Sequence, residues 1–302
     1  MMRHSIKAGR WFVLVLLLAL SGFVNGQQQS STCSQCDAWN KPQTPFRIYG
    51  NTYYVGPHGL SSILVTSQAG HVLMDGALPE SAPQIVANIR SLGFRIEDVK
   101  LIVNSHVHFD HAGGIAELQR LSGARVVASE WSAEVMTKSG LGHGDPQEHG
   151  GIPPIELVPN VSTLHDGESF RVGDTVVTAY LTPGHTPGGT SWTWKSCENG
   201  RCLNMVYADS VTAVSGKGFK FSQSREYPGA VKDFEKSFKF LDQVPCDILV
   251  TTHPEMSDLW SRLDGRKGGV SPDPMIDSEA CRNLAEASRD GLRARLASEG
   301  QP

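Results

Sequence analysis

Apolar residues follow two spacings along the chain, and these spacings alternate. Short segments rich in branched and aromatic residues, bounded by Gly, Pro, Asn or Ser, are typical of strands. Longer segments with apolar residues three or four positions apart are typical of helices. The expected strands lie within the segments 45–56, 61–76 (with a turn at QAG), 98–105, 124–129, 168–185 (more than one strand), 191–196, 204–211 and 246–252. The expected helices span 81–93, 113–123, 230–244 and 280–300.

Strands and helices alternate in both halves of the chain. The segment 98–105 is almost continuously apolar, as expected for a strand that is buried on both faces. A connection rich in Gly, Pro and His, from 140 to 154, separates the two halves. This order predicts a single α/β domain over 45–302, with sheets at the centre and helices outside.

The first 26 residues have a different pattern. A basic segment, MMRHSIKAGR, precedes the apolar segment WFVLVLLLALSGFV, and Val24 and Gly26 are small residues suited to a cleavage site. The apolar segment falls short of the roughly 20 residues that a membrane-spanning helix needs, which disfavours an anchor. We therefore expect a secretory signal peptide over 1–26, a periplasmic protein, and no membrane contact in the mature form.

The charge of the chain disfavours nucleic acid as a binding partner. The chain has 27 Lys and Arg against 31 Asp and Glu, a formal net charge of -4, and its basic residues form no run beyond isolated pairs. A surface that follows a phosphate backbone is not indicated, so we expect no nucleic-acid partner. A nuclease is disfavoured for the same reason.

Export changes the interpretation of the six cysteines, because an oxidising compartment permits disulfides. Cys197 and Cys202 flank the turn-forming sequence ENGR, so a local bridge across a hairpin is the natural inference. Cys246 begins an expected strand, and Cys281 lies on the first turn of the last expected helix. A bridge between these two would pin that helix to the sheet.

The pair Cys33 and Cys36 is spaced like a redox or zinc pair. No second such pair exists in the sequence, and the surrounding residues are rich in Gln and Ser. We expect a flexible N-terminal segment over 27–44, in which these cysteines form a local pair or stay unpaired.

The sequence NSHVHFDHAGG, residues 104–114, places four candidate metal ligands where a buried strand ends. His106 and His108 point to the same side of an extended segment, so both can bind one ion. Asp110 and His111 follow in the turn and can approach a second ion from another direction. Imidazoles with one carboxylate suit Zn(II), with Fe(II) or Mn(II) as alternatives. A cluster of surface histidines would leave this spacing unexplained.

Two later histidines, His185 in LTPGHTPGG and His253 in LVTTHPE, also follow expected strands. Side chains at strand ends can converge from different strands, so both are candidate ligands. The remaining histidines of the mature chain lie in polar turns, where we expect them to be solvated, with His143 and His149 able to rim a site: His58, His71, His143, His149 and His165.

The motifs HVHFDH, PGHTPGG and THP together resemble the metallo-β-lactamase superfamily. The likeness runs from about Pro45 to the end, and YADSVTAVS with CDILVTTHPE is similar to subclass B3. The resemblance implies an αβ/βα four-layer sandwich, in which two central mixed β-sheets are flanked by helices. It also implies a two-zinc site between the sheets.

By this resemblance, six side chains would hold the two ions. Those of the first zinc would be His106, His108 and His185, and those of the second Asp110, His111 and His253.

The resemblance also assigns residues around the metals. Ser210 and Thr212 would contact a substrate carboxylate directly or through water, and Gln147 resembles a substrate-facing loop residue. The pairs Cys197 with Cys202 and Cys246 with Cys281 match disulfides of the subclass. His58 stands where some relatives have a cysteine that bonds an N-terminal one, which leaves the partners of Cys33 and Cys36 open.

The implied activity is hydrolysis of the amide bond of penicillins, cephalosporins and carbapenems, which would confer antibiotic resistance. Two zinc ions would generate a hydroxide near neutral pH that attacks the lactam carbonyl, so no serine nucleophile is needed. Asp110 would orient the attacking water. We expect a monomer with a small-molecule substrate.

Other activities are open at this point. The same fold supports hydrolases of lactones and thioesters and an iron-dependent oxygenase, and fold alone does not choose among them. In many of those relatives an aspartate near Asp209 bridges the metals, whereas subclass B3 does without it. A periplasmic metal-binding module without catalysis is a further alternative.

Overall fold

The computed structural model describes residues 1–2 and 33–300, and over 33–300 the strands form two mixed sheets. The first sheet has seven strands in chain order: β1 (Phe46–Tyr49), β2 (Thr52–Tyr54), β3 (Ile63–Ser67), β4 (Gly70–Met74), β5 (Val99–Val103), β6 (Arg125–Ser129) and β7 (Val161–Leu164). Strands β1 to β4 pair antiparallel, and β4 to β7 pair parallel. The parallel half has helical connections, as parallel pairing requires.

The second sheet has five strands in the order β12-β11-β10-β9-β8. They are β8 (Ser169–Val172), β9 (Thr175–Leu181), β10 (Thr190–Glu198), β11 (Arg201–Ala208) and β12 (Ile248–Thr251). Only β11 and β12 pair parallel, and the long helix between them is their crossover.

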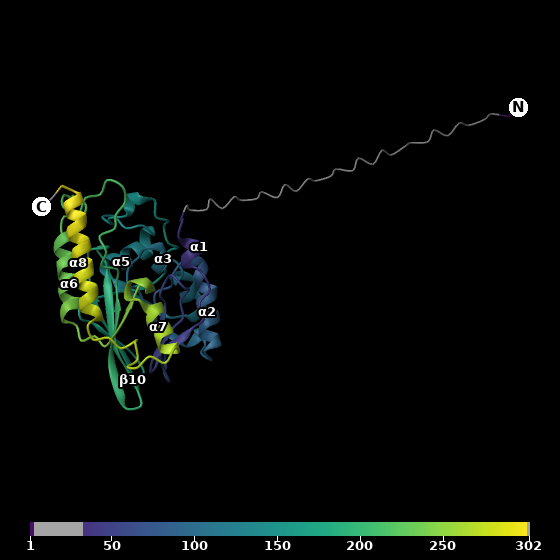
Figure 1. Ribbon diagram of the computed structural model, residues 1–302. Helices are drawn as coiled ribbons and strands as arrows, with labels where there is room; N and C mark the ends of the chain where they lie inside the picture. The colour runs from purple at the N-terminus through teal and green to yellow at the C-terminus, as the bar shows by residue number, and fades with distance from the viewer. Residues whose placement is uncertain (3–32, 301–302) are drawn as a thin grey trace. The chain divides into compact units, whose positions relative to one another are not determined.

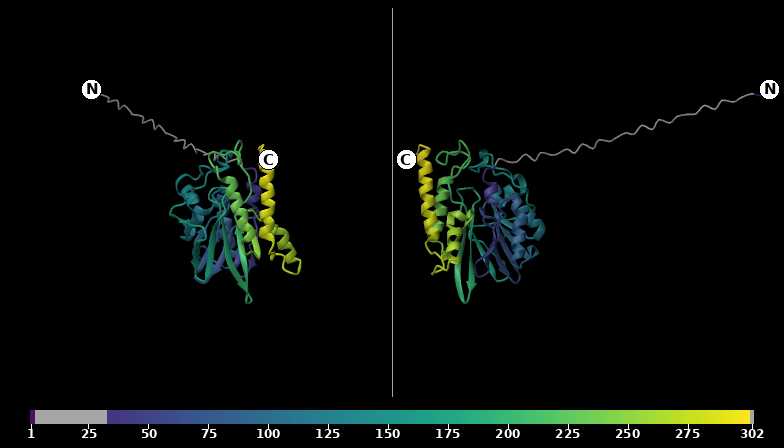
Figure 2. Two further views of the ribbon diagram at one scale, coloured as in Figure 1. Left: turned by 90° about the vertical axis from the view of Figure 1, so that its left-hand side faces the viewer. Right: turned by 45° about the vertical axis from the view of Figure 1, so that its right-hand side comes forward.

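Helices cover the outer faces of both sheets (Figures 1 and 2). Figure 1 shows α6 and α8 side by side on one outer face, with α2 on the other. The helices are α1 (Cys36–Trp39), α2 (Ala82–Ser91), α3 (Phe109–Ala112), α4 (Ile115–Ser122), α5 (Glu130–Glu134), α6 (Ala230–Gln243), α7 (Leu259–Lys267) and α8 (Ala280–Ser298).

The two sheets and the helices on their two outer faces make four layers of secondary structure. Three apolar layers lie between them. Successive side chains of a strand point to opposite faces, so β4 contributes Leu73 to the layer against α2 and α4. It contributes Val72 and Met74 to the layer between the sheets. The third layer joins the second sheet to α6 and α8, with Phe234 and Leu284 among its buried side chains. The predicted four-layer α/β sandwich is therefore confirmed.

Several elements were not predicted from the sequence, among them β7, α5 and α7. β7 has only four residues, and its polar side chains hide the strand pattern. α5 and the π-helical turn that follows it (Val135–Ser139) lie in a segment without clear apolar spacing. α7 contains Gly265 and carries mostly polar side chains. Its position depends on contacts with distant segments, such as Arg266 donating to the backbone oxygen of Ile48 at 2.8 Å.

The N-terminal residues 33–44 pack on the domain, in contrast to the flexible segment that we expected. Ser81 donates to the side chain of Asn40 at 2.7 Å, and Asn88 donates to the backbone oxygen of Gln43 at 3.2 Å. Polar side chains thus anchor a segment whose composition suggested flexibility. Residues 27–32, and the predicted signal peptide apart from its first two residues, lie outside the described part of the chain. Among the described residues, no helix is long and apolar enough to cross a membrane.

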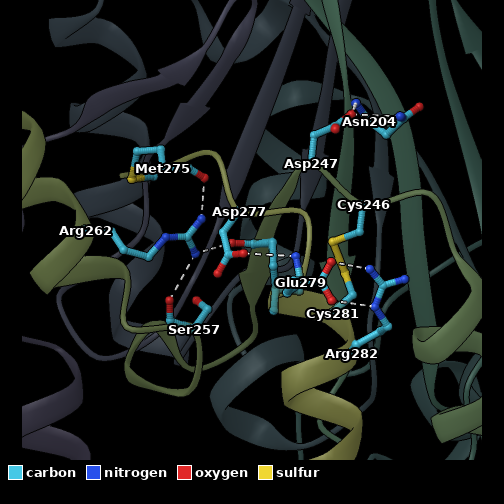
Figure 3. The surroundings of a disulfide bond; sticks show 11 residues. Asn204, Cys246, Asp247, Ser257, Arg262, Met275, Asp277, Glu279, Cys281 and Arg282 are labelled. Carbon is cyan, nitrogen blue, oxygen red and sulfur yellow. Dashed lines mark hydrogen bonds and ion pairs between the residues drawn. A yellow bond between two sulfur atoms is a disulfide. The ribbon is translucent and has the colours of Figure 1, made fainter. Parts of the chain in front are cut away.

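The structure contains the two expected disulfides and a third between Cys33 and Cys36. Cys197 and Cys202 face each other across the β10–β11 hairpin. Figure 3 shows the bond between Cys246, just before β12, and Cys281 at the start of α8. This bond ties the outer helix layer to the second sheet.

Removal of the Cys246–Cys281 bond is expected to destabilise the domain more than removal of the hairpin bond. Cys246 and Cys281 are 35 positions apart in the sequence, whereas Cys197 and Cys202 are 5 positions apart. Loop-closure entropy then predicts losses of about 4 and about 2 kcal/mol in the free energy of unfolding. Urea unfolding of the two double Cys→Ser variants measures both, and a larger loss for the hairpin variant would contradict this account.

Candidate metal centre

The six candidate ligands lie at one end of the two-sheet stack. His106 and His108 follow β5 of the first sheet, whereas His185 and His253 follow β9 and β12 of the second. The remaining two, Asp110 and His111, lie on the short helix α3, which begins directly after His108. The ends of strands from both sheets therefore bring the side chains together.

His106, His108 and His185 form the first cluster, with candidate ligand atoms within 4.8 Å of one another. Nε2 of His185 and Nδ1 of His108 are 3.3 Å apart. Nε2 of His106 is buried and has no hydrogen-bond partner. A buried polar atom without a partner is costly, and a metal ion among these three nitrogens would satisfy it.

Asp110, His111 and His253 form the second cluster. Oδ2 of Asp110 lies 3.2 Å from Nε2 of His111 and 3.4 Å from Nε2 of His253. The two Nε2 atoms are 3.2 Å apart. Ligands at 2.0–2.1 Å from a tetrahedral zinc are about 3.3–3.4 Å from each other, so this cluster has the spacing that zinc needs.

Asp209 contacts His106 of the first cluster through the ring nitrogen that is not a candidate ligand atom. Its Oδ1 lies 2.7 Å from Nδ1 of His106, on the side of the ring remote from Nε2. The carboxylate is therefore the outer partner of a ligand and belongs to neither cluster. Such an acceptor fixes the tautomer and the orientation of the imidazole that it holds.

Two further acceptors orient the other histidines of the first cluster. Oδ2 of Asp145 lies 2.9 Å from Nε2 of His108, and the backbone oxygen of Thr212 accepts from Nδ1 of His185 at 2.8 Å. Asp145 was not singled out from the sequence, because it lies in the Gly-, Pro- and His-rich connection, where no periodic pattern marks it.

The environment keeps most of these groups in the protonation states that metal ligands need. Burial lowers the pKa of His106 well below its usual range and that of His185 to about 3, so both imidazoles are neutral. Burial opposes the charge of Asp110, but His111 and His253 outweigh it and hold the pKa of Asp110 well below its usual range.

His108 differs from the other two histidines of the first cluster. Burial opposes its charge, yet the nearby Asp145 outweighs burial and raises the pKa of His108. A metal ion at this cluster therefore competes with a proton, and its affinity should increase as the pH rises.

Asp75 holds the loop that carries His106 and His108. Its Oδ1 accepts from the backbone N–H of Ser105 at 2.7 Å, and its Oδ2 accepts from the Tyr207 hydroxyl at 2.8 Å. Asp75 follows β4 of the first sheet, and Tyr207 lies on β11 of the second. This buried carboxylate thus links both sheets to the ligand loop.

A cleft of about 640 Å³ opens above the two clusters and is lined by all the predicted substrate-contact residues. Ser210 shares a hydrogen bond with the Thr252 hydroxyl, at 2.8 Å. The Thr212 hydroxyl lies 3.3 Å from Nδ1 of His185, and Nε2 of Gln147 lies 3.4 Å from Nε2 of the same histidine. All three therefore line the same cleft, and Thr212 and Gln147 lie beside His185 of the first cluster.

The other histidines differ partly from expectation. His71 lies on β4 and is buried against Phe94, so it is not solvated. His58 lines the cleft and stacks on Trp260. The side chains of His143 and His149 are exposed, as expected.

Trp39 also lines the cleft, although it was not a candidate from the sequence. Its ring centroid is 5.2 Å from that of His253. It lies in the segment expected to be flexible, so no sequence signal indicated its contact with the candidate ligand His253.

Comparisons with known proteins agree with this geometry. Residues 55–198 match the family model described as "Metallo-beta-lactamase superfamily". The solved structure of Rm3 metallo-beta-lactamase is 56% identical, with a TM-score of 0.86, and the alignment covers 89% of this chain and 99% of that one. MEM-A1, a subclass B3 metallo-beta-lactamase isolated from a soil metagenome library, is 51% identical, with a TM-score of 0.83 and coverages of 87% and 98%.

Curated relatives are more distant. A hydroxyacylglutathione hydrolase from Maricaulis maris (strain MCS10) is 34% identical over 162 residues, which are 54% of this chain and 50% of that protein. The chain spans only about half of the length of the first curated relatives that it matches.

The substitution Asp145→Ala is expected to weaken metal binding at the first cluster about 10–100-fold, because it removes the outer partner of His108. Chelator competition with metal-loaded protein measures the affinity. Asp264→Ala is a matched control, since Asp264 is an exposed carboxylate paired with Lys267. Equal affinities in Asp145→Ala and the control would show that Asp145 does not support the cluster.

Proposed function

Because the chain belongs to the metallo-beta-lactamase superfamily, and within it to the subclass B3 enzymes, we propose that it is a zinc-dependent β-lactamase that hydrolyses the amide bond of β-lactams. The observation that carries this proposal is the pair of ligand clusters beneath a cleft lined by hydroxyl groups. The proposed substrates are penicillins, cephalosporins and carbapenems, and the proposed consequence is antibiotic resistance.

The donor atoms suit two zinc ions. His106, His108 and His185 would hold the first, and Asp110, His111 and His253 the second. When bound, a zinc pair supplies Lewis acidity for a carbonyl oxygen and lowers the pKa of water toward neutrality.

The protein itself contributes orientation and charge. The Asp110 carboxylate stays anionic and lies 3.2 Å from Nε2 of His111, at the floor of the cleft that it helps to line, so it can accept a hydrogen bond from a water and orient that water. Asp209, Asp145 and the backbone oxygen of Thr212 keep the first three imidazoles in fixed orientations. A rigid arrangement of this kind reduces the entropy lost when substrate and water meet.

Substrate orientation is assigned to three residues at the cleft. The hydroxyls of Ser210 and Thr212 can donate to the carboxylate that β-lactams carry beside the ring nitrogen. Gln147 contributes an amide on the opposite loop, close to His185. No serine nucleophile is required, so Ser210 has a binding role.

Hydrolysis of lactones or thioesters is the second candidate. The curated hydroxyacylglutathione hydrolases support it, but they share only a part of their length with this chain. The β-lactamase structures are more similar and are covered almost completely. The position of Asp209 outside both clusters also favours the B3 arrangement. The open cleft over the metals argues against a purely metal-storing module.

The cellular setting is also a proposal. The basic and apolar segments of residues 1–26 support export through a signal peptide, and the three disulfides fit an oxidising compartment such as the periplasm. We assign the active form to a monomer, because all six ligands come from one chain.

Zinc-loaded protein without the signal segment should hydrolyse a penicillin and a carbapenem, and a chelator should abolish the activity. His185→Ala and Asp110→Asn each remove a ligand, so turnover should fall by more than about 100-fold. Steady-state kinetics measures this, with an acyl-homoserine lactone as the comparison substrate. Turnover of the lactone alone, or full activity after metal removal, would contradict the proposal.

Ser210→Ala should raise KM for a β-lactam about tenfold, the value of one lost hydrogen bond to a charged group, with a smaller change in kcat. The same lactam as its methyl ester is the control, because it lacks the carboxylate. A loss that is equal for acid and ester would show that Ser210 has another role.

A further inference from the structure

The two clusters differ in how their imidazoles are held. Each histidine of the first cluster has a polar partner on its remote nitrogen, from Asp209, Asp145 or the backbone of Thr212. The second cluster has no such support within residues 33–300. Nδ1 of His111 is buried without a partner, and the hydrogen bonds of the described residues do not include Nδ1 of His253.

His253 is also the most exposed of the ligands, with 18% of its side chain accessible. Its backbone oxygen accepts from the Thr251 hydroxyl at 2.6 Å, which fixes the main chain but not the ring. Rotation of the ring about its side-chain bonds would move Nε2 away from Asp110 and His111. Some other contact must therefore restrain the ring if the cluster is to keep its spacing.

The indole of Trp39 makes that contact. Its centroid is 5.2 Å from that of His253, and the planes are tilted by 54°. Contacts of this geometry between aromatic rings are favourable, and a large rigid indole leaves the imidazole less room to turn. Trp39 also packs against the apolar layer of the first sheet, so its own position is restrained.

Helix α1 and its surroundings hold Trp39 in place. The backbone oxygen of Trp39 accepts from the N–H of Gly59 at 2.9 Å, and the N–H of Trp39 donates to Gln35 at 2.9 Å. A side chain at position 59 would come within 2.6 Å of the Trp39 Cα atom, so only glycine permits this approach. The backbone on both sides of the indole is thus fixed.

The Cys33–Cys36 disulfide closes the turn that leads into α1. A helix of four residues does not form by itself, because helix nucleation is unfavourable. Gln35 lies within the loop that the bond closes, and Trp39 is in the single helical turn that begins at Cys36, so the bond restricts the backbone that leads to Trp39. Figure 1 shows α1 and α3 at the same end of the domain, whereas the β10 hairpin lies at the other end.

We propose that Trp39 is a positioning residue for the second metal cluster, and that the Cys33–Cys36 disulfide keeps helix α1 in the conformation that places Trp39 on His253. The inference rests on the metal-binding part of the proposed function. It does not depend on the identity of the substrate. It gives a role to the N-terminal segment and to a cysteine pair that the metal site itself does not use.

The test is titration of the metal-free full domain with Co²⁺, whose absorption reports the two sites separately. In Trp39→Ala, the dissociation constant of the second site should rise about tenfold or more, with the first site changed less than about threefold. Trp39→Phe keeps an aromatic contact and should restore most of the affinity. Cys33→Ser/Cys36→Ser should weaken the second site in the same selective way.

Cys197→Ser/Cys202→Ser is the matched control, because it removes a short-range disulfide at the far hairpin. It should leave both cobalt affinities unchanged. An unchanged second site in Trp39→Ala, or an equal loss at both sites, would overturn the proposal. If Trp39→Ala does not fold, Trp39→Phe and the Cys33→Ser/Cys36→Ser variant decide, and normal second-site affinity in the latter refutes the role of the disulfide.

Cobalt titration and β-lactam hydrolysis together distinguish failure of this inference from failure of the proposed function. A protein that binds two cobalt ions but hydrolyses no β-lactam would refute the proposed substrate and leave the role of Trp39 open to the same titration. Selective loss of the second ion in Trp39→Ala would still support the positioning role. Active wild-type enzyme with an insensitive second site would refute only the role of Trp39.

Discussion

The site depends on one constraint: strands of two different sheets must end at the same place. The candidate ligands of the first cluster come from the ends of β5 and β9, and those of the second from α3 and the end of β12. The apolar layer between the sheets fixes their distance, and the buried Asp75 links both sheets to the loop after β5. The spacing of the candidate ligands is therefore a property of the packed sandwich.

The two clusters differ in burial and in the groups that contact their side chains. The first is buried and has polar outer partners, which select the nitrogen that each imidazole presents. The second has an anionic carboxylate and a partly exposed imidazole beside an indole. The imidazoles of the first cluster therefore have more polar restraints than those of the second, although residues of both clusters line the cleft. This difference makes the second site the one that the N-terminal segment can influence.

Much of the site could be predicted from the sequence, because its signals are local. The spacing of His106, His108, Asp110 and His111 after an apolar strand indicated the two groups of ligands, and strand ends marked His185 and His253. The supporting residues Asp75, Asp145 and Trp39 could not be found in this way. Each acts through a contact with a residue distant in sequence, and none belongs to a periodic pattern. The same reason explains why β7 and α7 were missed, since tertiary contacts place these weakly patterned segments.

The central claim is that the two clusters hold two metal ions while Asp209 stays outside them. The most direct measurement is X-ray anomalous diffraction at the zinc absorption edge from crystals of the zinc-loaded protein. The account predicts two peaks, one among His106, His108 and His185 and one among Asp110, His111 and His253. A single peak, or an ion coordinated by the carboxylate of Asp209, would contradict it.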